Sequence, residues 1–378
     1  MSRLFLLRCT GSLVLSLATG LWWAPLVVAQ QSGPVGLPSA SLAKTRQAAI
    51  AYLRTTQSDD GHWSDYPGPA ITGIVTKSLL DAGAPPDDPM IQQALAYLQQ
   101  ALQPDGGIYT RENKVSNYET SVALLAFAAA NRDGKYDQLI ANAREYLKKL
   151  QWDESEGLTP DDPRYGGGGY GKSERPDPSN TSFLLEALKA AGVKDNDESM
   201  KKVVIFLSRC QNLESEHNTT EFASKINDGG FYYTPAGGGN SQAGNDANGG
   251  LRSYASMTYA GLKSMIYAGV GPDDPRVKAA MEWLKKHYTL TENPGMGQKG
   301  LYYYYHTFAK ALSVAKIDRM EDGKKVPHDW RKELGDHLIA KQRENGSWIN
   351  TDSGWLEGDP NLVTAYALMA LKYCETPK

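Results

Sequence analysis

The segment Gln57-Ser-Asp-Asp-Gly-His-Trp63 decides the fold, because related segments recur along the 378-residue chain. The same order of glutamine, three residues, glycine, one residue and an aromatic ring is found at Gln103–Tyr109 and Gln342–Trp348. Gln151 and Gln211 begin longer, glycine-rich versions of the segment. A unit that recurs at intervals of tens of residues indicates a repeat architecture, in which each unit buries its apolar face against its neighbours.

Each of these loops lies between two predicted helices of different character. The run before a loop is amphipathic and rich in Lys and Arg, which is typical of a helix with one face in solvent. The run after a loop is richer in Ala, Leu and Met, which is typical of a buried helix. The predicted outer helices are residues 45–56, 91–102, 138–150, 198–209, 276–288 and 330–341. The predicted inner helices are residues 71–82, 118–129, 181–191, 254–268, 307–315 and 362–373.

Six such hairpins in an open row would leave two uncovered ends, and closing the row into a ring removes both. We therefore predict an all-α fold, an α/α-toroid (α6/α6 barrel) of six helical hairpins. Residues 41–375 are expected to form this single domain, with residues 30–40 as a linker. An open helical solenoid is the alternative, but its turns are usually short and even, whereas several loops here are long.

Residues 1–29 are predicted to be an export signal. Arg3 and Arg8 give a positive start, an apolar stretch follows, and Ala29 precedes the polar Gln30. An uncleaved membrane anchor is the alternative, since the stretch is nearly the ~20 residues that span a bilayer. We expect cleavage, a secreted or periplasmic protein, and no stable membrane span afterwards. Lys and Arg number 40 against 43 Asp and Glu, and this near-balance argues against a nucleic-acid partner.

The pattern of Gln57–Trp63 resembles the QW motif of squalene and oxidosqualene cyclases. The predicted ring also resembles the β subunits of protein prenyltransferases, over essentially all of residues 41–375. The chain looks like the standalone secreted bacterial prenyltransferase/squalene-oxidase repeat proteins of this terpenoid cyclase superfamily. In the cyclases the glutamine and the aromatic ring tie outer helices together. The resemblance therefore implies structural roles for Gln57, Trp63, Gln103, Tyr109, Gln342 and Trp348.

The resemblance also shows where a cyclase acid would lie. Cyclases of this kind protonate an alkene with a strongly acidic carboxyl group, in a D-x-D-D-T-A motif that opens an inner helix. The best match is Asp177-Pro-Ser-Asn-Thr-Ser182, which makes Asp177 a catalytic candidate. Ser179 stands in the position of the proton donor, and neither it nor Asn180 can act as a strong acid. We expect Ser179 or Asn180 to cap the helix instead.

A second catalytic candidate is His306, because protein prenyltransferases hold zinc with Asp, Cys and a His in a Tyr-His-Thr segment. Tyr305-His306-Thr307 matches that segment. The preceding inner helix supplies neither Asp nor Cys at its start, and a single His is not a zinc site. Cys210 and Cys374 are expected at opposite faces of the ring, where they can neither replace these ligands nor form a disulfide. We therefore expect no metal and no cofactor.

The first turns of the inner helices are expected to surround one mouth of a central cavity. Tyr302–Tyr305 is interpreted as an extended segment that turns alternate tyrosines into this cavity. The glycine-rich loop 237–250 is interpreted as a flap above it. The residues predicted to line the cavity are Glu119, Asn180, Arg252, Tyr254, Tyr303, Tyr305, Trp355 and Asp359.

Three functions remain open at this point, and whether the protein is an enzyme is among the open questions. The first is a cyclase- or prenyltransferase-like ring that binds an isoprenoid-type apolar small molecule, with or without transforming it. The second is a non-catalytic extracytoplasmic binding or scaffold protein. The third is a sugar-active α/α-barrel enzyme, in which Glu119, Asp228 and Asp246 would provide the acid and the base.

Overall fold

The computed structural model describes residues 33–66, 68–172 and 175–377, and its main compact unit begins at Val35. Their regular secondary structure is helical apart from isolated bridges and one antiparallel hairpin of two strands, β1 (Met320–Glu321) and β2 (Pro327–His328). No helix within them is both long enough and apolar enough to cross a bilayer. The predicted signal peptide, residues 1–29, lies outside the described residues.

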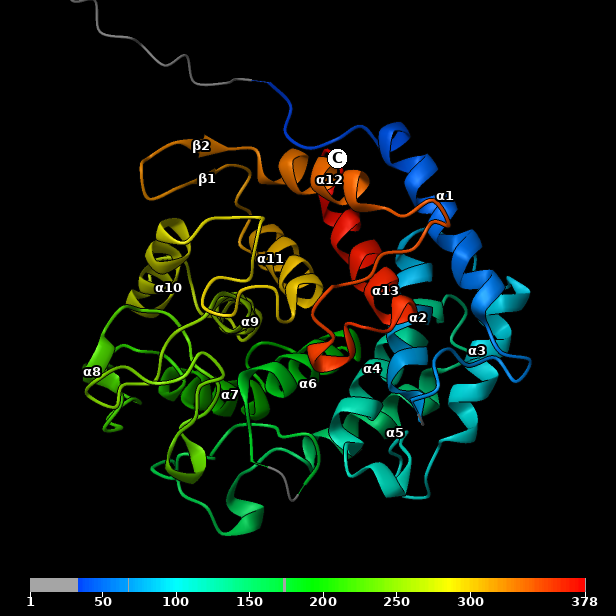
Figure 1. Cartoon of the computed structure of the whole chain (residues 1–378). Helices are drawn as coiled ribbons and strands as arrows, with labels where there is room; N and C mark the ends of the chain where they lie inside the picture. The colour runs from blue at the N-terminus through cyan, green and yellow to red at the C-terminus, as the bar shows by residue number, and fades with distance from the viewer. Residues whose placement is uncertain (1–32, 67, 173–174, 378) are drawn as a thin grey trace, which may run out of the picture. The chain divides into compact units, whose positions relative to one another are not determined.

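Six long helices form an inner ring and six more surround them (Figure 1). The inner helices are α2 (Pro69–Asp81), α4 (Ser116–Ala130), α6 (Pro178–Ala190), α9 (Ala255–Tyr267), α11 (Leu301–Val314) and α13 (Pro360–Leu371). The outer helices are α1 (Ser39–Thr56), α3 (Pro89–Gln100), α5 (Asp137–Lys148), α7 (Glu198–Arg209), α10 (Pro275–Lys286) and α12 (Trp330–Lys341). The remaining helices of the described chain are short: η1 (Arg111–Asn113), η2 (Glu154–Glu156), α8 (Ala223–Ile226), η3 (Ala236–Gly238), η4 (Gly354–Leu356) and η5 (Lys372–Cys374).

The ring is closed. Each inner helix packs against the next one along the chain, and α13 packs against α2. The two ends of the unit are also joined, because Leu37 pairs with Glu375 and Arg46 forms an ion pair with the same glutamate. The predicted all-α toroid of six hairpins is therefore confirmed, and an open solenoid is excluded. Helix α1 begins at Ser39, inside the segment expected to be a linker.

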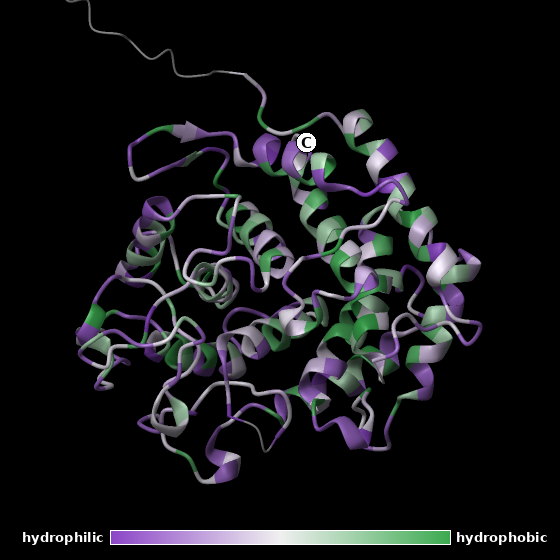
Figure 2. Ribbon diagram, in the orientation of Figure 1, coloured by the Kyte–Doolittle hydropathy of each residue, from purple (hydrophilic) through white to green (hydrophobic). Residues whose placement is uncertain are grey.

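The difference in hydropathy between the two rings explains their arrangement. Figure 2 shows apolar residues along the central helices and polar residues along the peripheral ones. Every residue of α13 from Leu362 to Leu371 is buried, because neighbouring inner and outer helices cover it on all sides. An outer helix such as α5 buries only one stripe, consisting of Ala143, Tyr146 and Leu147, as expected for an amphipathic helix at a surface.

Asp-Pro pairs set the start of four helices. In α3, α6, α10 and α13 the proline occupies the first position, where its missing N–H costs nothing. The preceding carboxylate accepts a backbone N–H of the first turn and so caps the helix. In α6 the cap is Asp177, not Ser179 or Asn180 as predicted. The extended backbone of Asp177 directs its carboxylate to the Asn180 N–H, whereas Ser179 and Asn180 already lie within the helix.

Four glutamine side chains join consecutive outer helices. Each amide donates one hydrogen bond to a glycine carbonyl of its own loop and one to a carbonyl near the start of a neighbouring outer helix. Gln342 joins the two ends of the chain in this way, since its Nε2 lies 2.9 Å from Gly346 O and 2.9 Å from Thr45 O on α1. The equivalent inter-helix contacts are Gln57 to Met90 O, Gln151 to Ser199 O and Gln211 to Arg276 O.

Gln103 departs from this pattern. Its amide donates only to Tyr109 O and Ala101 O, within its own loop, so the expected tie between outer helices is absent at this glutamine. Tyr109 instead stacks on Tyr146 of α5, which joins the loop to that helix through ring contact. The two tryptophans hold the preceding outer helix: Trp63 Nε1 donates to Leu53 O and Trp348 Nε1 to Leu338 O, at 2.7 and 2.8 Å.

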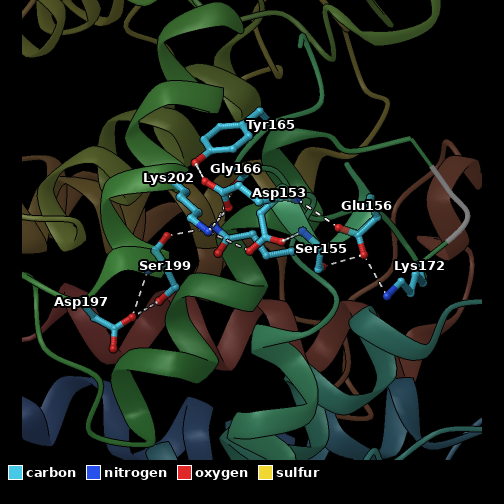
Figure 3. A network of polar contacts seen from close by, with 11 residues as sticks. Asp153, Ser155, Glu156, Tyr165, Gly166, Lys172, Asp197, Ser199 and Lys202 are labelled. Atoms are coloured by element: carbon cyan, nitrogen blue, oxygen red, sulfur yellow. Dashed lines mark hydrogen bonds and ion pairs between the residues drawn. The ribbon is translucent and has the colours of Figure 1, made fainter. Parts of the chain in front are cut away.

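The loop between α5 and α6 shows how a longer connection is fixed to the ring (Figure 3). Lys202 of α7 reaches across to Asp153, 2.9 Å away, and to Glu154. Gly166 lies against α7 so closely that an added Cβ would be 1.8 Å from Lys202 O. Only glycine fits at this position, which also has a φ of +87°. The long loop is therefore packed onto the ring.

The glutamine contacts generate a prediction about stability. Gln342→Ala leaves two carbonyls without their donor, and we expect it to lower the free energy of unfolding by about 1–3 kcal/mol. Gln103→Ala is the matched control, because it breaks bonds within one loop only, and its cost should be smaller. Urea unfolding followed by circular dichroism measures both. Equal losses would contradict the role given to Gln342.

Candidate functional site

A cavity of about 430 Å³ opens at the end of the ring where the inner helices begin, here called the loop face. Its wall comes from the first two turns of all six inner helices and from the loops that precede them. The lining residues are Tyr66, Ala70, Ile71, Val115, Tyr118, Tyr170, Ser179, Asn180, Phe183, Tyr233, Tyr254, Ser256, Met257, Tyr303, Trp355, Leu356, Leu362 and Tyr366.

Aromatic rings make up most of the inner wall. The Tyr118 ring meets Phe183 edge to face with centroids 5.2 Å apart, and Tyr303 lies 5.9 Å from Tyr366 in the same geometry. Phe183 and Tyr303 face each other at 6.4 Å. Ring pairs at these separations are mutually attractive, so the wall is held in shape without a ligand.

One side of the wall is polar. The hydroxyl groups of Ser179 and Tyr303 lie 2.8 Å apart, and both residues line the cavity. Asn180 and Tyr233 lie beside them. The Asn180 amide and the Tyr233 hydroxyl each donate to the same oxygen of Asp177, at 2.7 and 3.1 Å.

Asp177 lies directly behind this polar patch and is fully buried. Burial raises the pKa of its carboxyl group to about 6, although the hydrogen bonds from Asn180 and Tyr233 oppose the shift. Asp177 does not line the cavity itself. Its oxygens accept hydrogen bonds from the helix start and from these two side chains, an arrangement that fixes the position of the polar patch.

Of the eight residues predicted to line the cavity, four do so: Asn180, Tyr254, Tyr303 and Trp355. The other four lie elsewhere. Glu119 accepts from Thr110 N and Asn113 Nδ2. Asp359 caps α13 and Arg252 is exposed. The Tyr305 hydroxyl donates to Leu290 O and lies 2.8 Å from His337 of α12, so that ring points outward.

The prediction for Tyr302–Tyr305 was wrong about the backbone. Helix α11 begins at Leu301, so these tyrosines turn by about 100° per residue instead of alternating. Tyr303 alone among them faces the cavity, and Tyr304 packs outward with its hydroxyl donating to Thr289 O. The expected flap was also misplaced, because residues 237–250 contribute nothing to the cavity wall.

A buried glutamate explains why this helix starts so early. Glu357 accepts from Tyr302 N and Tyr303 N, at 3.2 and 2.7 Å, and from Asn350 Nδ2 at 2.6 Å. It therefore caps α11 from the loop before α13. Burial raises the pKa of Glu357 to about 7.

The mouth of the cavity exposes large apolar side chains. Tyr66, Tyr170, Trp355 and Leu356 line the cavity and are 36–45% exposed. Trp355 and Leu356 both have positive φ angles, 55° and 64°, which is an uncommon conformation for bulky residues. The Trp355 ring lies against Gly300 and under the Lys299 ammonium group.

The comparisons with known proteins support the fold. A family model described as the squalene-hopene cyclase C-terminal domain matches residues 56–234. The type II terpene cyclase MstE from Scytonema has 15% identity and a TM-score of 0.51, over 89% of this chain and 98% of that one. The GH76A α-1,6-mannanase from Salegentibacter has 9% identity and a TM-score of 0.54, over 88% and 99%. No curated protein matches the sequence significantly.

Residues 56–234 therefore match a terpenoid cyclase family model, and the described chain shares the toroid of that superfamily. The predicted resemblance to that superfamily is thus confirmed. At such low identity the solved structures establish the shared toroid alone, and the mannanase shows that the same toroid also serves sugar chemistry.

The sequence did not identify several of the residues that line the cavity of this ring. Phe183 and Tyr366 are inner-helix residues whose rings could equally have packed into the core. Tyr170 and Tyr233 end glycine-rich loops, where the recurring glycine-aromatic pairing was a usable signal. Whether an aromatic ring near the loop face lines the cavity or packs into the core depends on its position around the helix. That position depends on the residue at which the helix begins.

The second catalytic candidate, His306, lies one turn below Tyr303 and is buried with its ring parallel to Tyr366. Burial, with Lys310 and Lys263 nearby, lowers its pKa well below the usual value. Among the described residues no group of three His, Cys, Asp or Glu side chains is placed to hold a metal ion. Cys210 and Cys374 are both buried and free.

The raised pKa of Asp177 generates a prediction about pH. The folded chain favours the protonated carboxyl group, so this contribution to stability is complete below about pH 4 and is lost as the pH rises through about 6. Asp177→Asn removes the titration. The unfolding free energy of the parent, relative to this variant, should therefore fall by up to about 3 kcal/mol across that window.

Asp88→Asn is the control, because that residue caps α3 and the hydrogen bond from Arg54 lowers its pKa. Its effect on stability should stay constant between pH 4 and 6. Thermal unfolding at a series of pH values measures both variants. A parent-to-Asp177→Asn difference that does not change with pH would contradict the account of Asp177.

Proposed function

We propose that this ring binds an isoprenoid-type apolar molecule in the cavity at the loop face and does not protonate it. The observation that carries the proposal is the wall itself, which combines aromatic and aliphatic side chains with a small patch of neutral polar groups. No carboxylate contributes to that wall in the described chain. The resemblance to terpene cyclases supports a ligand of the same class.

The size and composition of the cavity support an apolar small molecule. A volume of about 430 Å³ lies within the range of roughly 300–1,000 Å³ that is typical of small-molecule sites. Such sites are mostly apolar, with a few polar groups that fix orientation. Aromatic faces suit the double bonds and methyl groups of an isoprenoid chain.

The polar patch supports one end of the ligand being polar. Ser179, Asn180, Tyr233 and Tyr303 offer hydroxyl and amide groups on one side of an otherwise apolar wall. A hydroxyl group on the ligand can exchange hydrogen bonds with Ser179 and Tyr303 without introducing a buried charge. An isoprenoid alcohol therefore suits the site better than a pure hydrocarbon.

The ring is proposed not to protonate an alkene because residue 179 is a serine. By resemblance, this position holds the acid of a cyclase, and here its side chain is a neutral hydroxyl bonded to Tyr303. Asp177 keeps a carboxyl group, but its oxygens face the helix start and the polar patch from behind. A hydroxyl group is far too weak an acid to protonate an alkene.

A sugar-active enzyme is the second candidate, and the shared toroid of the mannanase is what favours it. The carboxylates proposed for that enzyme form hydrogen bonds away from the cavity. Asp228 accepts from Gly230 N, Ser253 Oγ and Trp283 Nε1, and Asp246 holds a turn by accepting from Gly250 N. Neither lines the cavity, so the acid and the base that glycoside hydrolysis requires are not at this site.

We place this activity outside the cytoplasm, in the periplasm or the surrounding medium, on the strength of the export signal predicted for residues 1–29. An apolar ligand in that compartment needs a carrier or a binding protein, because it is poorly soluble in water. The partner proposed is this small molecule, with no requirement for a metal or a cofactor.

Ligand binding tests the proposal. Geranylgeraniol, the corresponding hydrocarbon and α-1,6-mannotetraose are titrated into the purified protein, and the change in tryptophan fluorescence is followed. We expect saturable binding of one geranylgeraniol per chain, recovered unchanged after incubation. Binding of mannotetraose alone would favour the sugar-active alternative. A cyclised product would show that the site holds a functional acid, and no binding at all would favour a scaffold.

A pair of variants tests the orientation of the ligand. Tyr303→Phe removes the hydroxyl group that faces the cavity, and Tyr304→Phe removes one that bonds Thr289 O outside it. Each change costs one hydrogen bond. We expect Tyr303→Phe to weaken geranylgeraniol binding by roughly 3- to 10-fold, about 1 kcal/mol. It should leave hydrocarbon binding unchanged, and Tyr304→Phe should affect neither.

A further inference from the structure

Six charged side chains gather at the face of the ring opposite the loop face, near the C-terminal ends of the inner helices. They are Lys77 and Asp81 of α2, Glu186 of α6, Lys263 of α9, Lys310 of α11 and Lys372 after α13. We call them the basic cluster. None of them lines the cavity, so the cluster is separate from the proposed isoprenoid site.

The cluster consists of two carboxylates, each held between two ammonium groups. Glu186 forms ion pairs with Lys263 and Lys310, and these side chains are only 2–11% exposed. Asp81 forms ion pairs with Lys77 and, at 2.8 Å, with Lys372. The first triad joins α6, α9 and α11, and the second joins α2 to the end of α13.

Each triad carries one positive charge more than its carboxylate can neutralise. The surplus charge of one triad acts on the other. Burial lowers the pKa of Lys77 although Asp81 lies beside it, and the charge of Lys310 in the other triad lowers this pKa further. Lys263 shows the same effect, with burial and Lys310 bringing its pKa to about 8. A buried charge without a counterion is costly, so the arrangement favours an additional negative group.

The cluster is accessible to a small ion. Lys77 and Lys310 retain 16% and 11% exposure of their side chains, and Lys372 retains 40%. Tyr267 and Tyr373, both partly exposed, lie close to Lys310: burial raises the pKa of both hydroxyl groups, and the charge of Lys310 opposes that shift. Their hydroxyl groups add neutral donors beside the ammonium groups.

We propose that the basic cluster binds one inorganic oxyanion of the size of phosphate or sulfate at the opposite face of the ring. Ammonium groups on several helices surround such an ion and donate charge-assisted hydrogen bonds to it. The bound ion neutralises the surplus positive charge of both triads. It also adds a contact between inner helices that are distant in sequence. The site is independent of the cavity and of any ligand in it.

Equilibrium dialysis with radiolabelled inorganic phosphate tests this site. We expect one phosphate per chain, displaced by sulfate but not by chloride at the same ionic strength. Lys77→Met removes one ammonium group and should weaken phosphate binding at least about ten-fold. Lys189→Met is the matched control, because this lysine of α6 pairs with Asp195 and is not part of the cluster.

If Lys77→Met does not fold, Lys372→Met replaces it, since that side chain is the most exposed of the four lysines. Phosphate binding that is absent from the parent, or is equally displaced by chloride, would overturn the proposal. So would full retention of binding in the folded cluster variant. The carbonyl ends of the inner helices would then be the groups that balance the lysines.

Discussion

All six inner helices run in the same direction around a closed ring, and the chemistry at both ends follows from that constraint. Their N-termini meet at the loop face, where unpaired N–H groups favour carboxylates. Asp177, Asp359 and Glu357 satisfy this demand by capping α6, α13 and α11. Their C-termini meet at the opposite face, where lysines gather. The ring is thus acidic at its helix starts and basic at its helix ends.

The same constraint places the cavity at one end of the ring. The first turns of the inner helices splay around a mouth, and their rings form its wall. Below that wall, His306 and the ion pairs of Glu186 are buried farther along the inner helices. Hydrogen bonds such as Gln342 to Thr45 O hold the outer helices together. The carboxyl groups at the mouth are used to build it, which leaves neutral groups facing a ligand.

The fold could be predicted because its signals are local. A glutamine, a glycine that permits close approach and an aromatic ring recur in five of the six hairpins, and the Asp-Pro pairs set the starts of four helices. Only half of the predicted lining residues were right, because the side of a helix on which a residue lies depends on where that helix begins. A start at Leu301, fixed by the distant Glu357, turns Tyr303 inward and Tyr305 outward. No pattern within residues 301–305 reveals a cap supplied from position 357.

Photo-cross-linking tests the central claim most directly, because it locates the ligand as well as detecting it. A diazirine analogue of geranylgeraniol is bound to the full-length protein and irradiated, and the labelled peptides are mapped by mass spectrometry. The account predicts adducts on the first two turns of α6, α11 and α13, around Phe183, Tyr303 and Tyr366, with labelling abolished by excess geranylgeraniol. Adducts confined to the outer helices, or labelling that excess ligand does not displace, would contradict it.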